Sequence, residues 1–129
     1  MSGWLGNAAA QNRIRDLVRT ESVRGTPVFT CEGTQTGIVE DLVISKESGQ
    51  VAYVLISCGG LLGLGAKDRP LPWRLLSFSI KDGGYVLNVP EEFLLSAPTY
   101  DDTSALSVDF ASRVEDHYIR GKEPPILNT

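Results

Sequence analysis

Apolar and polar positions alternate through the middle of the chain in the way that β-strands require. The clearest stretch is Gln50–Ser57 (QVAYVLIS), which is almost wholly apolar. Such a run is typical of a strand at the centre of a small sheet or barrel, where both faces are covered. Before it, Pro27–Cys31 and Thr36–Ser45 are rich in β-forming residues and predict two further strands.

Turn signals separate these strands. Lys46–Gly49 predicts a tight hairpin loop whose glycine adopts a positive φ at low cost, and Lys81–Gly84 predicts a second loop. Between them, Arg69–Ile80 ends in strand-like alternation, and its two prolines place its beginning at a strand start or sheet edge. Tyr85–Val89 then returns as a strand.

Short helical patterns flank the β-rich region. Ala8–Arg19 carries three apolar residues at i, i+3 and i+4 and predicts a short helix. Glu91–Ser96 follows a proline and has acidic residues in its first turn, as the helix dipole favours. Val108–Tyr118 predicts a second helix on this side, and Gly121–Thr129 predicts a loose tail.

Composition narrows the class of protein. The chain has 129 residues, of which 42% are hydrophobic and 22% charged, as expected for one globular domain. The formal net charge is −4. Because nucleic-acid binding depends on basic side chains that neutralise phosphates, we expect no direct contact with DNA or RNA.

Cysteine usage and the chain's apolar runs indicate a cytoplasmic protein. The two cysteines, Cys31 and Cys58, lie far apart, so we expect free and mostly buried thiols rather than a disulfide. With one histidine, His117, they lack the close ligand pairs of a zinc site. We find no signal peptide and no run long enough to span a membrane.

The middle of the sequence resembles the PRC-barrel domain. The elements that carry the resemblance are "GIVEDLVIS", "SGQVAYVLIS", the loop "GGLLGLGAK", "LPWRLL" and the acidic turn "PEEFLLSAP", in this order. The end of the chain, "APTYDD…VEDHYIRG", is similar to that of small stand-alone bacterial members. The resemblance implies a mainly β fold, a small and strongly bent antiparallel β-barrel with short flanking helices.

The same resemblance implies an interaction module rather than a catalyst. The family includes the cytoplasmic part of the photosynthetic reaction-centre H subunit and the C-terminal domain of a ribosome-maturation factor. This chain has neither the transmembrane helix of the former nor the N-terminal domain of the latter. We therefore divide it into an N-terminal, partly helical flank (1–19), a PRC-barrel domain (20–98) and a C-terminal extension with a short helix and a loose tail (99–129).

The glycine-rich loop after the central strand is the candidate interaction surface. Its leucines would present apolar surface to a partner or to a second copy. Spacing within the loop does not match a phosphate-binding motif, because the lysine is displaced by one position and no hydroxyl follows it. Trp73 is expected to fill the barrel, with an interface role as the alternative. The candidate surface comprises Leu61, Leu62, Leu64, Lys67 and Trp73.

No residue pattern predicts a catalytic, cofactor or metal site. His117 lies among acidic neighbours, which predicts a solvated helix face, and Cys58 is expected to be buried at a strand end. Glu40 and Asp41 are adjacent on a strand, so alternation places them on opposite faces.

We therefore expect a non-enzymatic, self-associating adaptor, a homodimer that also binds a protein not identified by the sequence. One alternative is a regulatory domain that responds to a small molecule or a metal. The other is an accessory protein of the ribosome or of RNA processing, which would bind a basic protein through its acidic charge.

Overall fold

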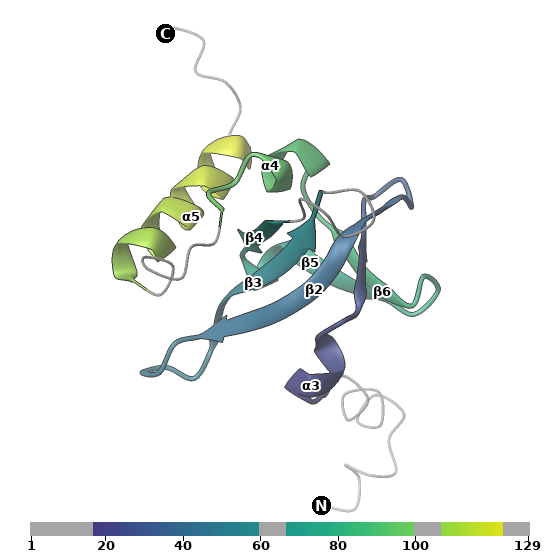
Figure 1. The fold of residues 1–129 in the computed structure, drawn as a ribbon, viewed down its shortest axis with the longest axis horizontal. Helices are drawn as coiled ribbons and strands as arrows, with labels where there is room; N and C mark the ends of the chain where they lie inside the picture. Colours follow the sequence, from purple (N-terminus) through teal and green to yellow (C-terminus); the bar gives the residue numbers. More distant parts are fainter. Residues whose placement is uncertain (1–16, 60–66, 100–106, 123–129) are drawn as a thin grey trace, which may run out of the picture.

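The structure is a computed structural model and describes residues 17–59, 67–99 and 107–122. Within them, one bent six-stranded sheet carries short helices at its sides (Figure 1). The strands are β1 (Pro27–Phe29), β2 (Gln35–Ile44), β3 (Val51–Cys58), β4 (Lys67–Leu71), β5 (Leu76–Ser79) and β6 (Gly84–Leu87). The helical elements are α3 (Thr20–Val23), the 3-10 turn η1 (Trp73–Leu75), α4 (Glu91–Leu95) and α5 (Val108–Lys122).

The strand order is β4-β3-β2-β1-β6-β5. Neighbouring strands are antiparallel except β1 and β6, which run parallel. The predicted fold, mainly β and strongly bent with short flanking helices, is confirmed. The sheet does not close into a ring, so β4 and β5 remain as its two edges.

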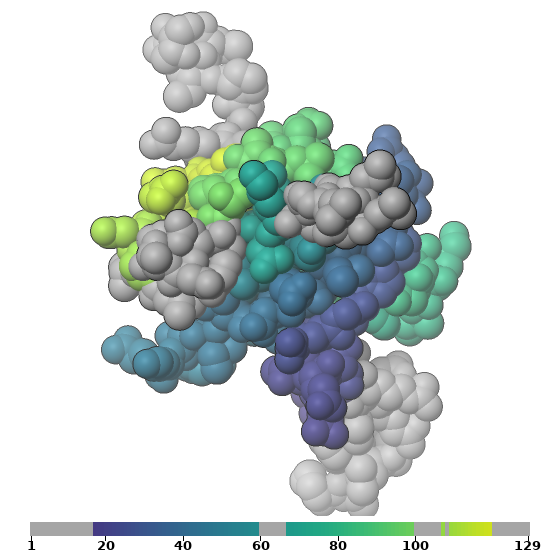
Figure 2. Space-filling model, in the orientation of Figure 1, coloured from purple at the N-terminus to yellow at the C-terminus, as the bar shows by residue number. Residues whose placement is uncertain are grey.

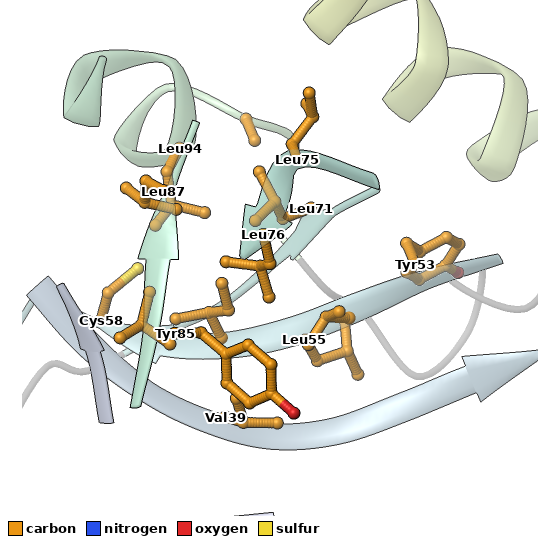
Figure 3. Close-up of a cluster of buried hydrophobic side chains, with 14 of the residues drawn as sticks. Val39, Tyr53, Leu55, Cys58, Leu71, Leu75, Leu76, Tyr85, Leu87 and Leu94 are labelled. Atoms are coloured by element: carbon orange, nitrogen blue, oxygen red, sulfur yellow. The ribbon is translucent and has the colours of Figure 1, made fainter. Parts of the chain in front are cut away.

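The bend of the sheet is concentrated in β2, which curves beneath the core (Figure 3). Its pairing with β3 shifts register between Val39 and Asp41, which marks a β-bulge. A bulge bends its strand and increases the local twist. It also interrupts the alternation predicted for Glu40 and Asp41, and both residues are exposed.

Strand β3 is buried along most of its length, as its apolar sequence predicts. Its Tyr53 ring meets the Phe110 ring of α5 edge to face, with the centroids 5.9 Å apart. Helix α5 buries three residues at a spacing of four, Phe110, Val114 and Tyr118. The core thus combines residues of the sheet with one face of this helix. Figure 3 shows its central members, Val39, Tyr53, Leu55, Cys58, Leu71, Leu75, Leu76, Tyr85, Leu87 and Leu94.

Two glycines have specific structural roles. Gly49 has φ +78° in the β2–β3 hairpin, as the sequence predicts. A Cβ on Gly84 would collide with the Pro27 carbonyl oxygen. Glycine at this position therefore lets β6 approach β1 closely enough to pair with it.

The β4 edge of the sheet is covered by the helices. Pro70 has no N–H to offer, and its carbonyl oxygen accepts a hydrogen bond of 2.6 Å from the buried Tyr118 hydroxyl. Arg69 donates from Nη1 to the Ala97 carbonyl oxygen just after α4, at 3.2 Å. Helices α4 and α5 both pack against β4. This strand therefore offers little of its backbone to another chain.

The structure corrects several expectations near the ends of the chain. Most of the predicted helix 8–19 lies outside the described residues, but its last three residues are not helical and the helix begins at Thr20. The exposed side chains of Leu17 and Val18 show that the predicted apolar face has no packing partner within the described residues. Helix α5 continues to Lys122, beyond the predicted end at Tyr118.

Two side chains are also placed differently from the prediction. His117 is half-buried rather than solvated, because α5 packs it against α4, where its Nε2 lies 2.6 Å from the Phe93 carbonyl oxygen. Cys31 is exposed rather than buried, since β1 ends at Phe29 and the chain turns there into solvent. Cys58 is buried at the end of β3, as predicted.

In the part of the chain that the structure describes, none of the helices has the length and apolar character needed to cross a membrane.

We predict that Tyr118→Phe destabilises the protein by about 1–3 kcal/mol, because it leaves the buried Pro70 carbonyl without its donor. Equilibrium urea unfolding measures this change. Tyr85→Phe is the matched control, since burial alone raises the pKa of Tyr85 and no hydrogen bond contributes to the shift. Equal stability of Tyr118→Phe and wild type would contradict the assigned role.

The same variant should also change how the stability of the protein depends on alkaline pH. Burial raises the pKa of Tyr118 above its ordinary value, so it stays protonated in the folded chain while an unfolded tyrosine ionises near pH ~10. The stability that this difference contributes is complete below that pH and is lost as the pH rises past it. We expect Tyr118→Phe to lose less stability than wild type between neutral pH and strong alkali.

Candidate interaction surface

The sequence-predicted surface is only partly visible. Leu61, Leu62 and Leu64 lie outside the described residues. Lys67 is exposed at the first position of β4, where it pairs with Cys58. Trp73 opens η1, beyond the other end of β4, so the structure does not bring these two residues together.

The other edge of the sheet is open. Among the described residues, β5 has a hydrogen-bonded neighbour on one side only, β6. Its sequence, Leu76–Ser79, contains no charged residue, no proline and no register shift. Charges, prolines and bulges usually protect an edge strand from pairing with other chains, and among these protections β5 has only its short length of four residues. The hairpin of β5 and β6 projects from the body of the molecule (Figures 1 and 2).

An aromatic row leads from the body to this edge. The Trp73 and Tyr85 rings meet edge to face with centroids 5.5 Å apart, and the Tyr85 and Phe78 rings meet in the same way at 5.3 Å. Tyr85 is buried, Trp73 is half-buried and Phe78 is 58% exposed. Burial raises the pKa of Tyr85, so its hydroxyl is neutral at physiological pH. Beyond Phe78, Ile80 is 88% exposed.

An open hollow of about 560 Å³ lies on the other side of Trp73. Its wall is formed by the start of β3, by η1 and by Glu115 of α5. Arg74 and Glu115 form a bidentate ion pair across it, with N–O distances of 2.9 and 2.8 Å. The hydrogen bonds that Arg74 donates to the Glu115 carboxylate raise the pKa of Arg74. Both side chains are half exposed, so the pair contributes less than about 1 kcal/mol to stability.

Elsewhere, the side chains that could act as a nucleophile or a base, Cys58 and His117, are held in structural contacts. Burial raises the pKa of the Cys58 thiol, with a partly opposing effect of Arg69, so at neutral pH the sulfur is protonated. Because the Phe93 carbonyl can only accept, Nε2 of His117 carries a proton and donates it. The described residues contain no group of three side chains suited to hold a metal ion.

Phe78 and Ile80 are the surface residues that the sequence reasoning missed. Their alternation with serines predicts a strand, and the sequence assigns neither of them to the candidate surface. The usable signal was the lack of any charge within the strand, which is unusual at an edge. That signal becomes informative only when the strand order places β5 at the end of the sheet.

Comparison with known proteins agrees with this fold. The family model described as PRC-barrel domain matches residues 15–94. A search of curated proteins finds no match to the chain.

We predict that one thiol reacts rapidly with a thiol reagent in the folded protein and the other only on unfolding. Cys31 is exposed, whereas Cys58 is buried and its pKa is raised. A colorimetric thiol assay at neutral pH, with and without urea, counts both. Cys31→Ser should remove the fast phase, and a fast phase that persists in this variant would contradict the assignment.

Proposed function

We propose that this chain, which belongs to the PRC-barrel domain family, is a non-catalytic module that binds another protein along the open edge of its sheet. The observation that carries the proposal is the uncovered edge strand β5 with the exposed apolar side chain of Phe78, followed directly after the strand by exposed Ile80. An extended segment of a partner that adds to this edge gains main-chain hydrogen bonds. It also covers apolar surface that is otherwise left in water.

The aromatic row makes the edge suited to specific binding. Binding energy concentrates in aromatic anchors that are held rigidly and lie beside a desolvated centre. Phe78 is exposed, but its ring rests on buried Tyr85, which rests on Trp73. The side chain that a partner contacts is therefore held in place before binding, which lowers the entropy cost of association.

The two edges differ in a way that directs binding to one of them. The β4 edge is covered by the contacts of Tyr118 and Arg69 and by two helices. The β5 edge lacks an equivalent cover among the described residues. A module with one protected and one free edge binds a single strand and does not polymerise. Self-association and action in the cytoplasm, both expected from the sequence, are part of this proposal.

A second candidate function is supported by the hollow beside Trp73. Ligand sites range over roughly 300–1,000 Å³, and this hollow combines a tryptophan with the charged groups of Arg74 and Glu115. A metabolite that binds there would raise the melting temperature and quench or shift the Trp73 fluorescence, which a Trp4→Phe variant isolates. A metabolite screen read by melting temperature and Trp73 fluorescence tests it, and an unchanged result for every compound counts against it.

The main proposal predicts that capture of partner proteins depends on Phe78. The full tagged chain is incubated with lysate of its source cells at low salt, with nuclease, and bound proteins are quantified by mass spectrometry. Phe78→Ser should reduce stoichiometric partners at least tenfold, because it removes the apolar anchor and leaves the backbone unchanged.

Ile44→Ser is the matched control, since Ile44 is 55% exposed on β2, far from the β5 edge in strand order. It should capture the same partners as wild type. Equal capture by wild type and both variants would overturn the proposed surface. Recovery of a basic ribosomal protein through Phe78 would instead identify the pathway while keeping the site.

A further inference from the structure

We propose that the first partner of the β5 edge is a second copy of this chain, and that two β5 strands pair antiparallel about a two-fold axis at Phe78. The inference deepens the proposed function and rests on it, because it names the occupant of the same edge. Closed two-fold pairing uses one edge of each copy and leaves no further edge free for growth. Two features of the edge support this geometry, namely its backbone groups and its side chains.

The backbone of β5 presents the correct groups outward. The Asn88 N–H donates to the Leu75 carbonyl at 2.8 Å, and Ser77 pairs with Val86 two residues further along. In an antiparallel pair, hydrogen-bonded and non-hydrogen-bonded positions alternate. Phe78 therefore directs its N–H and C=O away from β6, toward the open edge. Two copies with Phe78 opposite Phe78 exchange both hydrogen bonds.

The side chains along the edge complement themselves in this register. With Phe78 on the axis, Ser77 lies opposite Ser79 of the second copy, and Leu76 lies beside its Ile80, which directly follows the strand. Apolar side chains thus meet on one face of the joined sheet and hydroxyls on the other. Aromatic and β-branched pairs opposite each other are favourable across strands. Exposed Phe78 lies at the centre of this contact, and exposed Ile80 lies at its end, directly after the strand.

Charge does not oppose this pairing. Strand β5 itself, Leu76–Ser79, contains no charged residue. The flanking charged residues lie outside the strand, Arg74 in η1 and Lys81 and Asp82 in the β5–β6 turn, and Arg74 is paired with Glu115. Shifting the register by one residue would put Phe78 opposite a serine.

Disulfide trapping between two different variants tests this register. In Cys31→Ser protein, which lacks the exposed native thiol, Ser77→Cys and Ser79→Cys are made separately. Opposed residues at a non-hydrogen-bonded position have Cα atoms about 4.5 Å apart, within the roughly 4.4–6.8 Å that a disulfide spans. We expect a covalent dimer when the two variants are mixed under mild oxidation, and none when either is oxidised alone.

Ser48→Cys provides the control for random collision, because Ser48 is exposed in the β2–β3 hairpin loop. It should give no dimer with either variant. A dimer from Ser77→Cys alone would show a different register and overturn the proposal. So would equal yields from the Ser48 control and the mixed pair.

Sedimentation velocity separates failure of the dimer from failure of the proposed function. Wild type and Ile44→Ser should dimerise with the same dissociation constant, and Phe78→Ser should raise it at least tenfold. If wild type is monomeric at every concentration while capture of another protein still depends on Phe78, the dimer is wrong and the binding edge stands. If neither dimerisation nor capture depends on Phe78, both are wrong.

Discussion

The main constraint on this structure is that an open sheet leaves unpaired backbone N–H and C=O groups at its two edges. At β4, a proline and the hydrogen bond from Tyr118 to the Pro70 carbonyl remove much of the edge's capacity to pair. At β5, the strand order leaves the edge without such a cover among the described residues, and Phe78 extends an aromatic row from the core to this edge. The bulge of β2 bends the sheet, and the gap between the two edges remains.

Sequence patterns recovered what local chemistry determines. The apolar run of β3, the hairpin glycine at position 49 and the proline-led helix α4 were all placed within one or two residues. Three features escaped because they depend on distant parts of the chain. The turn η1, the half-buried position of His117 and the exposure of Phe78 follow from how α5 and the β5–β6 hairpin sit against the body, which local periodicity does not encode.

The candidate surface assigned from the structure differs from the one predicted from the sequence for the same reason. Sequence alone pointed to the glycine-rich loop, because leucines among glycines cannot pack in a regular element. The structure adds exposed Phe78 on the edge strand β5, and Trp73 is the residue shared by both interpretations. A strand edge has a defined direction and spacing, so it selects a partner by backbone geometry as well as by side chains.

Tyr118 lies outside residues 15–94, the segment shared with the family, yet its hydroxyl reaches into the barrel to cover β4. The contacts that cover β4 therefore extend beyond the segment that the family model matches. A fusion protein built from residues 15–94 alone would keep Pro70 but would lack α5, so the Pro70 carbonyl would have no donor from Tyr118. Its β4 edge would then be more open to strands of other chains. The C-terminal helix is in this sense an intramolecular cap on the sheet.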